Sequence, residues 1–163
     1  MNITVSISDN ISTALTRLTS AAAQRDLMQA IGVGMVSLTK RSFEEASLRP
    51  AAWPARTTEG GHALLKKSGT LQRSIAITAL DDKSVSISSD RIYAAIHQFG
   101  GVIRPKKAGG RLAFSMGGRM VFAKSVTIPA RPFFPLSGGL SSAAEARIKE
   151  IVRIKLQKLA RPA

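Results

Sequence analysis

The chain has 163 residues, 44% of them hydrophobic, so it can bury the core of one compact domain but is too short for two ordinary domains. Lysine and arginine number 24 against 10 aspartates and glutamates, and the net charge of +14 implies an acidic partner, either nucleic acid or an acidic protein surface. The absence of cysteine excludes disulfides and thiolate metal sites, and no apolar run approaches the roughly 20 residues that span a bilayer.

The positive charge is concentrated in the middle of the chain. Between Asp90 and Glu145 there is no acidic residue. Basic residues are frequent in the same stretch: Arg91, Arg104, Lys106, Lys107, Arg111, Arg119, Lys124 and Arg131. We therefore expect this stretch to be the source of the positive field. Residues 1–10 have neither a basic start nor an apolar core, so we expect no signal peptide and synthesis in the cytoplasm.

The first predicted elements are a strand and a helix. Apolar and polar residues alternate over residues 3–7, which indicates a half-buried strand. Asp9 or Asn10 then caps a helix, because a short side-chain oxygen can accept the free N–H groups of the first turn. One face of this helix carries Ile11, Leu15 and Leu18.

A long helix is predicted from Ala21 to Ala46, where apolar residues recur every three to four positions. Gly32 and Gly34 lie inside it, and each costs about 1 kcal/mol relative to alanine. We expect a close packing contact at these glycines. The alternative, a phosphate-binding loop, lacks its third glycine and a preceding strand.

Residues 47–69 are rich in proline and glycine, which forbids a long regular element. Trp53, the only tryptophan, lies here, and we expect it to plug the edge of the core, with the anchoring of a partner as the alternative. From Ser68 the chain is predicted to turn into a strand at Ile75. Alternating apolar residues on both sides of Asp81-Asp82 predict an antiparallel hairpin, in which the aspartates form the turn rather than a metal or acid site.

A short helix is predicted next, with Asp90 as its cap and Gly100 as its left-handed end. Its expected buried stripe consists of Ile92, Ile96 and Phe99. Residues 102–127 are then predicted to form a basic hairpin insertion. Its two strands, residues 111–115 and 120–124, flank a turn that contains two glycines.

Pro129, Pro132 and Pro135 stiffen the segment that follows, because each fixes one backbone angle and removes one donor. Phe133 and Phe134 are held between these prolines, an arrangement that suits either a core clamp or an interface anchor. Ser141 or Ser142 then caps the last helix. The apolar stripe of that helix is Ile148, Ile151, Val152, Leu156 and Leu159.

The chain offers little chemistry for catalysis. Its two histidines are His62 and His97, and without cysteine they cannot assemble an ordinary zinc site from one chain. A triad of a serine, His97 and Asp90 would lack the strained nucleophile elbow. We expect His97 to be a structural residue, and we expect no enzyme activity, no metal and no cofactor.

Nucleic-acid binding is the competing interpretation of the charge. The acid-free stretch could contact phosphates, which would make binding salt-dependent. Aromatic residues are only 5% of the chain, however, and they do not interleave with the basic residues as stacking platforms would. No helix-turn-helix or zinc-finger signature is present.

Two motifs carry a resemblance to a known family. The first is Tyr93-Ala-Ala-Ile-His97-Gln98-Phe99-Gly-Gly101, and the second is Ile128-Pro-Ala-Arg131-Pro-Phe133-Phe134. Together with the weaker Ser68–Ser74 segment and the order of the elements, they resemble the phage virion morphogenesis family, which includes the tail-completion proteins of P2-like and Mu-like phages. The resemblance covers most of the chain.

The resemblance implies a structural assembly protein of the virion, made in the host cytoplasm and acting at the neck or the head-proximal end of the tail. Its implied partners are other neck and tail proteins, such as the tail terminator or tube and the head-completion or adaptor proteins. A homo-oligomer, as a ring around the tail axis, is the implied assembly. The family supplies no catalytic residues.

We therefore predict one α+β domain over residues 1–163, with an antiparallel sheet packed against a long N-terminal helix and a C-terminal helix. The basic hairpin is expected to meet acidic surfaces of a neighbouring subunit or a neck protein, and its base is expected to be fixed by packing of Tyr93, Phe99, Phe133 and Phe134. The interface candidates are Tyr93, His97, Gln98, Phe99, Arg104, Lys106, Lys107, Arg111, Arg119, Lys124, Arg131, Phe133 and Phe134.

Overall fold

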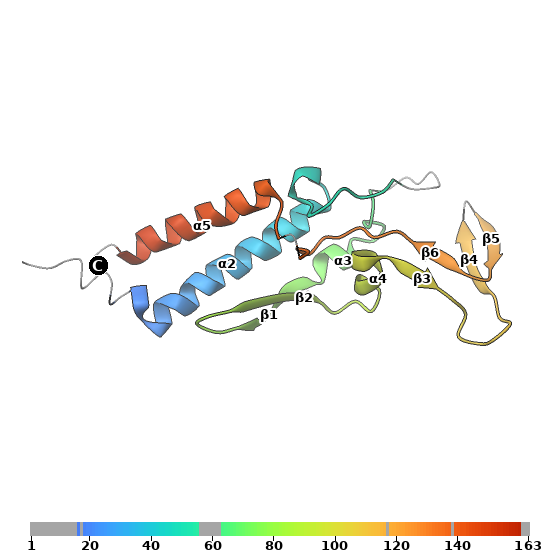
Figure 1. Ribbon diagram of the computed structural model, residues 1–163, viewed down its shortest axis with the longest axis horizontal. Coiled ribbons are helices and arrows are strands. Elements are labelled where there is room, and N and C mark those ends of the chain that lie inside the picture. The colour runs from blue at the N-terminus through green and yellow to red at the C-terminus, as the bar shows by residue number, and fades with distance from the viewer. Residues whose placement is uncertain (1–15, 17, 56–62, 117, 138, 161–163) are drawn as a thin grey trace, which may run out of the picture.

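A computed structural model of the chain describes residues 16, 18–55, 63–116, 118–137 and 139–160 (Figure 1). The strand expected over residues 3–7, the helix cap after it and His62 lie outside the described residues. The predicted α+β class is confirmed. Two long helices run side by side at one end of the elongated molecule, and a narrow extension made of strands forms the other end (Figure 1).

The first long helix, α2 (Ala21–Ser42), begins after Ser20, whose Oγ accepts a hydrogen bond of 3.2 Å from a backbone N–H of the first turn. The helix ends at Ser42, so the prediction that it continues to Ala46 is wrong at its C-terminal end. The guanidinium of Arg49 explains this end, because its Nε donates to the carbonyl oxygen of Ser42 at 2.8 Å and satisfies a group that the helix leaves free. A single 3-10 turn, η1 (Ala46–Leu48), follows.

The two glycines inside α2 allow neighbours to approach on opposite sides. A Cβ added at Gly32 would lie 2.6 Å from Cγ2 of Val85, and a Cβ added at Gly34 would lie 2.5 Å from Cδ1 of Ile151. Residues two apart on a helix are separated by about 200°, so one glycine faces the hairpin that contains Val85 and the other faces the C-terminal helix. The predicted close packing is confirmed, and neither glycine is open to a phosphate.

The hairpin under α2 is formed by β1 (Ile75–Leu80) and β2 (Val85–Ser89), as predicted. Asp81 forms the turn between them. Its Oδ1 accepts hydrogen bonds from the backbone N–H groups of Lys83, at 2.8 Å, and Ser84, at 2.6 Å. These bonds, with that from Lys83 the largest cause, lower the pKa of the Asp81 carboxyl. The interpretation of the aspartates as turn formers is therefore confirmed for Asp81.

The strands of the described residues form three separate two-stranded antiparallel sheets. After the short helix α4 (Ala94–Phe99), the chain leaves the body of the molecule and returns at residue 128. We call residues 101–128 the arm (Figure 1). Its inner sheet pairs β3 with β6, and its outer sheet is the predicted hairpin of β4 and β5: β3 (Gly101–Ile103), β4 (Leu112–Met116), β5 (Arg119–Ala123) and β6 (Val126–Ile128).

The main core lies where the end of α2 meets the base of the arm. Its buried members are Phe43, Trp53, Leu71, Ile75 and Phe133. Trp53 is 8% exposed, lies edge-on to Phe43 at 5.6 Å, and its Nε1 donates to the carbonyl oxygen of Pro132 at 2.7 Å. The prediction that Trp53 plugs the core is confirmed. Leu71 belongs to the one-turn helix α3 (Thr70–Arg73), which occupies the segment where only a turn was expected.

The last helix, α5 (Ser142–Ala160), runs antiparallel to α2 (Figure 1). Ser141 caps it, because its Oγ accepts a hydrogen bond from the N–H of Ala144 at 3.3 Å. Ile148 and Ile151 of the predicted stripe pack against α2, but Leu156 is 38% exposed. The stripe is buried only in part because α2 is the one long helix beside α5 in the part of the chain that the structure describes.

Within the described ranges, no helix combines the length and the apolar character that crossing a membrane requires.

Candidate functional site

The base of the arm is held by a buried glutamine. Gln98 is 4% exposed, and its Oε1 accepts hydrogen bonds from the backbone N–H groups of Phe133 and Phe134, both at 3.0 Å. Its Nε2 donates to the carbonyl oxygen of Phe134, also at 3.0 Å. One side-chain amide thus satisfies three backbone groups between the prolines. The two family motifs are bound to each other here.

Arg131 adds a second connection. It is 9% exposed, and its Nε and Nη2 donate to the carbonyl oxygens of Pro54, at 3.0 Å, and Ala55, at 3.1 Å. Its backbone N–H donates to the carbonyl oxygen of His97 at 2.7 Å. Through its guanidinium and its backbone N–H, Arg131 joins its own segment to residues 54–55 and to His97, so the base of the arm is held to the core.

Gly100 makes the contact between the motifs geometrically feasible. Its φ of 70° lies in the left-handed region, and a Cβ at this position would lie 2.7 Å from the backbone nitrogen of Ala130. Any side chain there would push the two motifs apart. The prediction that Gly100 ends the short helix is confirmed.

The predicted buried stripe of this short helix is wrong at two of its three positions. Ile92 is 99% exposed and Phe99 is 72% exposed, while Gln98 faces the interior. The helix begins only at Ala94, with Tyr93 rather than Asp90 before its first turn, so Ile92 precedes it. Phe99 is its last residue, about 100° around the axis from the buried Gln98.

The aromatic packing predicted at the base of the arm is correct only in part. Phe133 is 2% exposed and its ring lies 4.8 Å from that of Phe134. Tyr93, in contrast, is 38% exposed and lies edge-on to His97 at 6.0 Å, and Phe99 points to solvent. The base is therefore fixed by Gln98, Arg131 and Phe133 rather than by an aromatic quartet.

His97 has a structural environment. Its Nδ1 is buried and makes no hydrogen bond within the described part of the chain. Burial, and after it the charge of Arg131, lowers the pKa of His97, which favours the neutral form of the ring. The carboxylate of Asp90 is held through both oxygens by Arg91, at 2.8 and 2.6 Å, which leaves His97 without the orienting partner of a catalytic triad.

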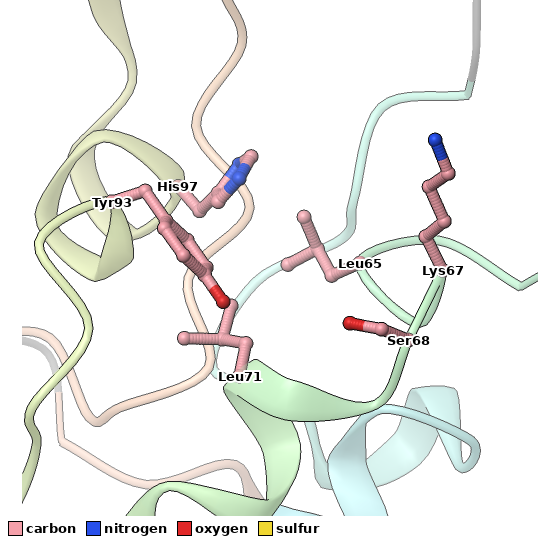
Figure 2. Close-up of a pocket in the computed structure, with 6 residues that line it drawn as sticks. All are labelled: Leu65, Lys67, Ser68, Leu71, Tyr93 and His97. Carbon is pink, nitrogen blue, oxygen red and sulfur yellow. The ribbon is translucent and has the colours of Figure 1, made fainter.

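A hollow of about 290 Å³ lies beside this histidine (Figure 2). His97 of α4 and Tyr93, which precedes α4, line one side of it, and Leu65, Lys67, Ser68 and Leu71 line it from the facing segment. The hydroxyl of Ser68 shares a hydrogen bond of 2.9 Å with that of Thr70, so it is not paired with a base. No set of three or more potential metal ligands occurs among the described residues. The hollow therefore contains no pair of nucleophile and base.

The arm presents its basic side chains to solvent. Six of the candidate residues are exposed on it, and none of them has an ion pair with a carboxylate of the described residues: Arg104, Lys106, Lys107, Arg111, Arg119 and Lys124. The arm itself has no carboxylate side chain, since residues 91–144 contain no aspartate or glutamate. The structure thus separates the candidates into exposed cations on the arm and buried groups at its base.

The arm also exposes apolar side chains, which the sequence analysis did not identify as candidates. Met120 is 62% exposed and Phe122 is 60% exposed, and their spacing places them on one face of β5. Val102, Ile103 and Met116 are also exposed, with exposed fractions between 41% and 46%, but Met116 pairs with Arg119 and so lies on the opposite face of the hairpin. Exposed apolar residues that gather on one element mark an interaction surface. The sequence did contain a signal for them, because both faces of the predicted hairpin carry apolar residues.

Comparisons with known proteins agree with this arrangement. The model of the phage virion morphogenesis family matches residues 7–157, which includes both motifs and the arm. The chain belongs to the phage virion morphogenesis family. It is 33% identical over 138 residues to the Mu-like prophage FluMu G protein 2 of Haemophilus influenzae, an alignment that covers 84% of this chain and 85% of that protein. No solved structure matches the chain significantly.

Membership of the phage virion morphogenesis family assigns this protein to the assembly of a phage virion. Partners among other virion proteins follow from that role. The family is a structural one.

Proposed function

We propose that this protein is a non-catalytic component of tail completion and head–tail joining, and that the arm is its docking element. The observation that carries the proposal is the arm itself. It projects from the body, exposes six cations and a row of apolar side chains, and is attached to the core through Gln98 and Arg131. A pre-organised surface of this kind loses little conformational entropy when it docks.

The proposed position is the neck or the head-proximal end of the tail, reached after synthesis in the host cytoplasm. The proposed partners are the tail terminator or tube proteins and the head-completion or adaptor proteins. We further propose that the chain acts as a homo-oligomeric ring. In such a ring the helical bodies would pack together, and each arm, at the opposite end of the elongated subunit, would point to the next component (Figure 1).

Electron microscopy of a lysate that lacks only this protein tests the proposal. The expected result is filled heads beside free tails of full length, because docking fails while head filling and tail elongation proceed. Supply of the protein from a plasmid is the control and should restore joined particles. Intact particles in the lysate without the protein would contradict the proposed position.

Duplex DNA is the second candidate partner, because the exposed cations of the arm could also contact phosphates. A shift in the electrophoretic mobility of duplex DNA at low micromolar protein, which added salt reduces steeply, would favour this function. The exposed Met120 and Phe122 favour a protein partner instead, since apolar side chains gain nothing from a phosphate backbone.

A further inference from the structure

A basic pocket lies at the open end of the hairpin formed by β4 and β5. Its volume is about 410 Å³. Arg104 follows β3, Lys107 lies in the loop, Arg111 precedes β4 and Lys124 follows β5, so four cations from separate points of the arm converge on one hollow. Like charges that line one hollow repel one another unless an anion lies between them.

The loop that forms the pocket wall is tightly folded. The backbone N–H of Gly110 donates to the carbonyl oxygen of Lys107 at 3.0 Å. A Cβ added at Gly110 would lie 2.9 Å from that oxygen and 3.3 Å from Cβ of Pro105. The backbone therefore has a compact turn here, which keeps Lys107 and Arg111 on the same hollow.

The described carboxylates of this chain are already in use. Six of them form ion pairs within the same chain: Asp26 with Lys155, Glu44 with Lys66, Glu45 with Arg41, Asp90 with Arg91, Glu145 with Lys149 and Glu150 with Arg153. Asp81 is bound in its own turn, which leaves Asp82 among the described acids. Among the described residues, a second copy of the chain therefore offers few carboxylates that could neutralise four cations.

We propose that this pocket binds carboxylates, and that it takes an acidic segment of a partner protein other than a second copy of this chain. The proposal rests on the docking role of the arm and adds the chemistry of the partner. Arginine and lysine bind carboxylates through charge-assisted hydrogen bonds, and arginine can do so through two at once. Met120 and Phe122 continue along β5 from the pocket and supply an apolar contact beside it, as at the centre of a protein interface.

Calorimetric titration of the purified full chain with a hexaglutamate peptide tests the pocket. Lys107→Glu and Arg111→Glu are the pocket variants. Lys106→Glu and Arg119→Glu are matched controls, since they make the same change of charge on the arm but do not line the pocket. We expect the pocket variants to bind at least about tenfold more weakly and the controls to lose less than about threefold. Equal losses in all four, with the fold intact by circular dichroism, would overturn the pocket.

Two further measurements separate the other occupants. Binding of a duplex of about 20 base pairs that Lys107→Glu abolishes, without binding of hexaglutamate, would overturn the assignment to protein. Self-association of the wild-type chain in sedimentation that Lys107→Glu abolishes would overturn the exclusion of a second copy. If the protein binds no hexaglutamate but is still required for joining, the inference about the pocket is wrong and the proposed function stands. If particles are intact in the absence of the protein, the proposed function is wrong.

Discussion

Replacing Phe133 by alanine is expected to lower the free energy of unfolding by about 3–5 kcal/mol. The ring is 2% exposed and lies 5.5 Å from the ring of Phe43 and 4.8 Å from that of Phe134. Its removal leaves a cavity at the point where the base of the arm meets the end of α2. Denaturant unfolding followed by the fluorescence of Trp53, which belongs to the same core, measures the change.

Phe122→Ala is the matched control, because it is the same chemical change at a ring that is 60% exposed on the arm. We expect its free energy of unfolding to stay within about 0.5 kcal/mol of the wild type. Equal destabilisation by the two variants would contradict the assignment of Phe133 to the core. If Phe122→Ala is stable but fails in joining, the exposed row on β5 is part of the docking surface.

Reversing Lys106 and Lys107 together to glutamate is expected to leave the fold intact and to block joining. Both side chains are exposed, and the arm has no acidic residue of its own. Because electrostatic steering raises association rates by about 10- to 1,000-fold, its loss should reduce the yield of joined particles by a comparable factor. Plaque titres in a complementation assay measure this effect, and circular dichroism measures the fold.

A charge-matched control for this variant lies on α5. Arg147→Glu combined with Lys158→Glu makes the same change of charge on exposed residues of the helix, far from the arm (Figure 1). We expect this control to complement nearly as well as the wild type. Full infectivity of the Lys106 and Lys107 variant would show that the docking role of the arm is wrong. Equal loss in both variants would assign the effect to net charge.

A further test concerns Gln98, which we expect to fix the base of the arm. Gln98→Leu keeps most of the side-chain volume but leaves the N–H groups of Phe133 and Phe134 without their acceptor. The free energy of unfolding should fall by about 2–4 kcal/mol. The exposed Gln157 of α5 is the control, since Gln157→Leu should change it by less than about 0.5 kcal/mol. A stability of Gln98→Leu equal to that of the control would contradict the role of this amide.

Local patterns were sufficient to predict several elements. The helix around Gly32 and Gly34, the turn at Asp81, the hairpin of the arm and the cap at Ser141 all depend on neighbours within a few positions. Helical periodicity, turn chemistry and capping act over such short separations, so a single sequence contains them. The two family motifs could also be recognised, because each is a run of consecutive residues.

The face of α4 that is buried could not be predicted in the same way. The six-residue helix has apolar side chains on several sides. Hydrophobic periodicity therefore favoured Ile92 and Phe99, rather than the polar Gln98, as buried residues. Gln98 is buried because two backbone N–H groups and one carbonyl group, 35 and 36 residues away, need the acceptor and the donor that a side-chain amide supplies. Hydrophobic periodicity carries no information about such distant partners.

The sequence by itself determined the α+β class, the membership of a phage virion morphogenesis family and the location of the positive charge, because composition and local spacing are properties of consecutive residues. Only the tertiary structure decided that Gln98, Arg131 and Phe133 are turned inward to hold the arm, while its cations and Phe122 face solvent. Which side chains become buried depends on contacts between segments that meet only when the chain closes on itself. Through those contacts, the two sequence motifs pack together and support the charged arm that projects from the body.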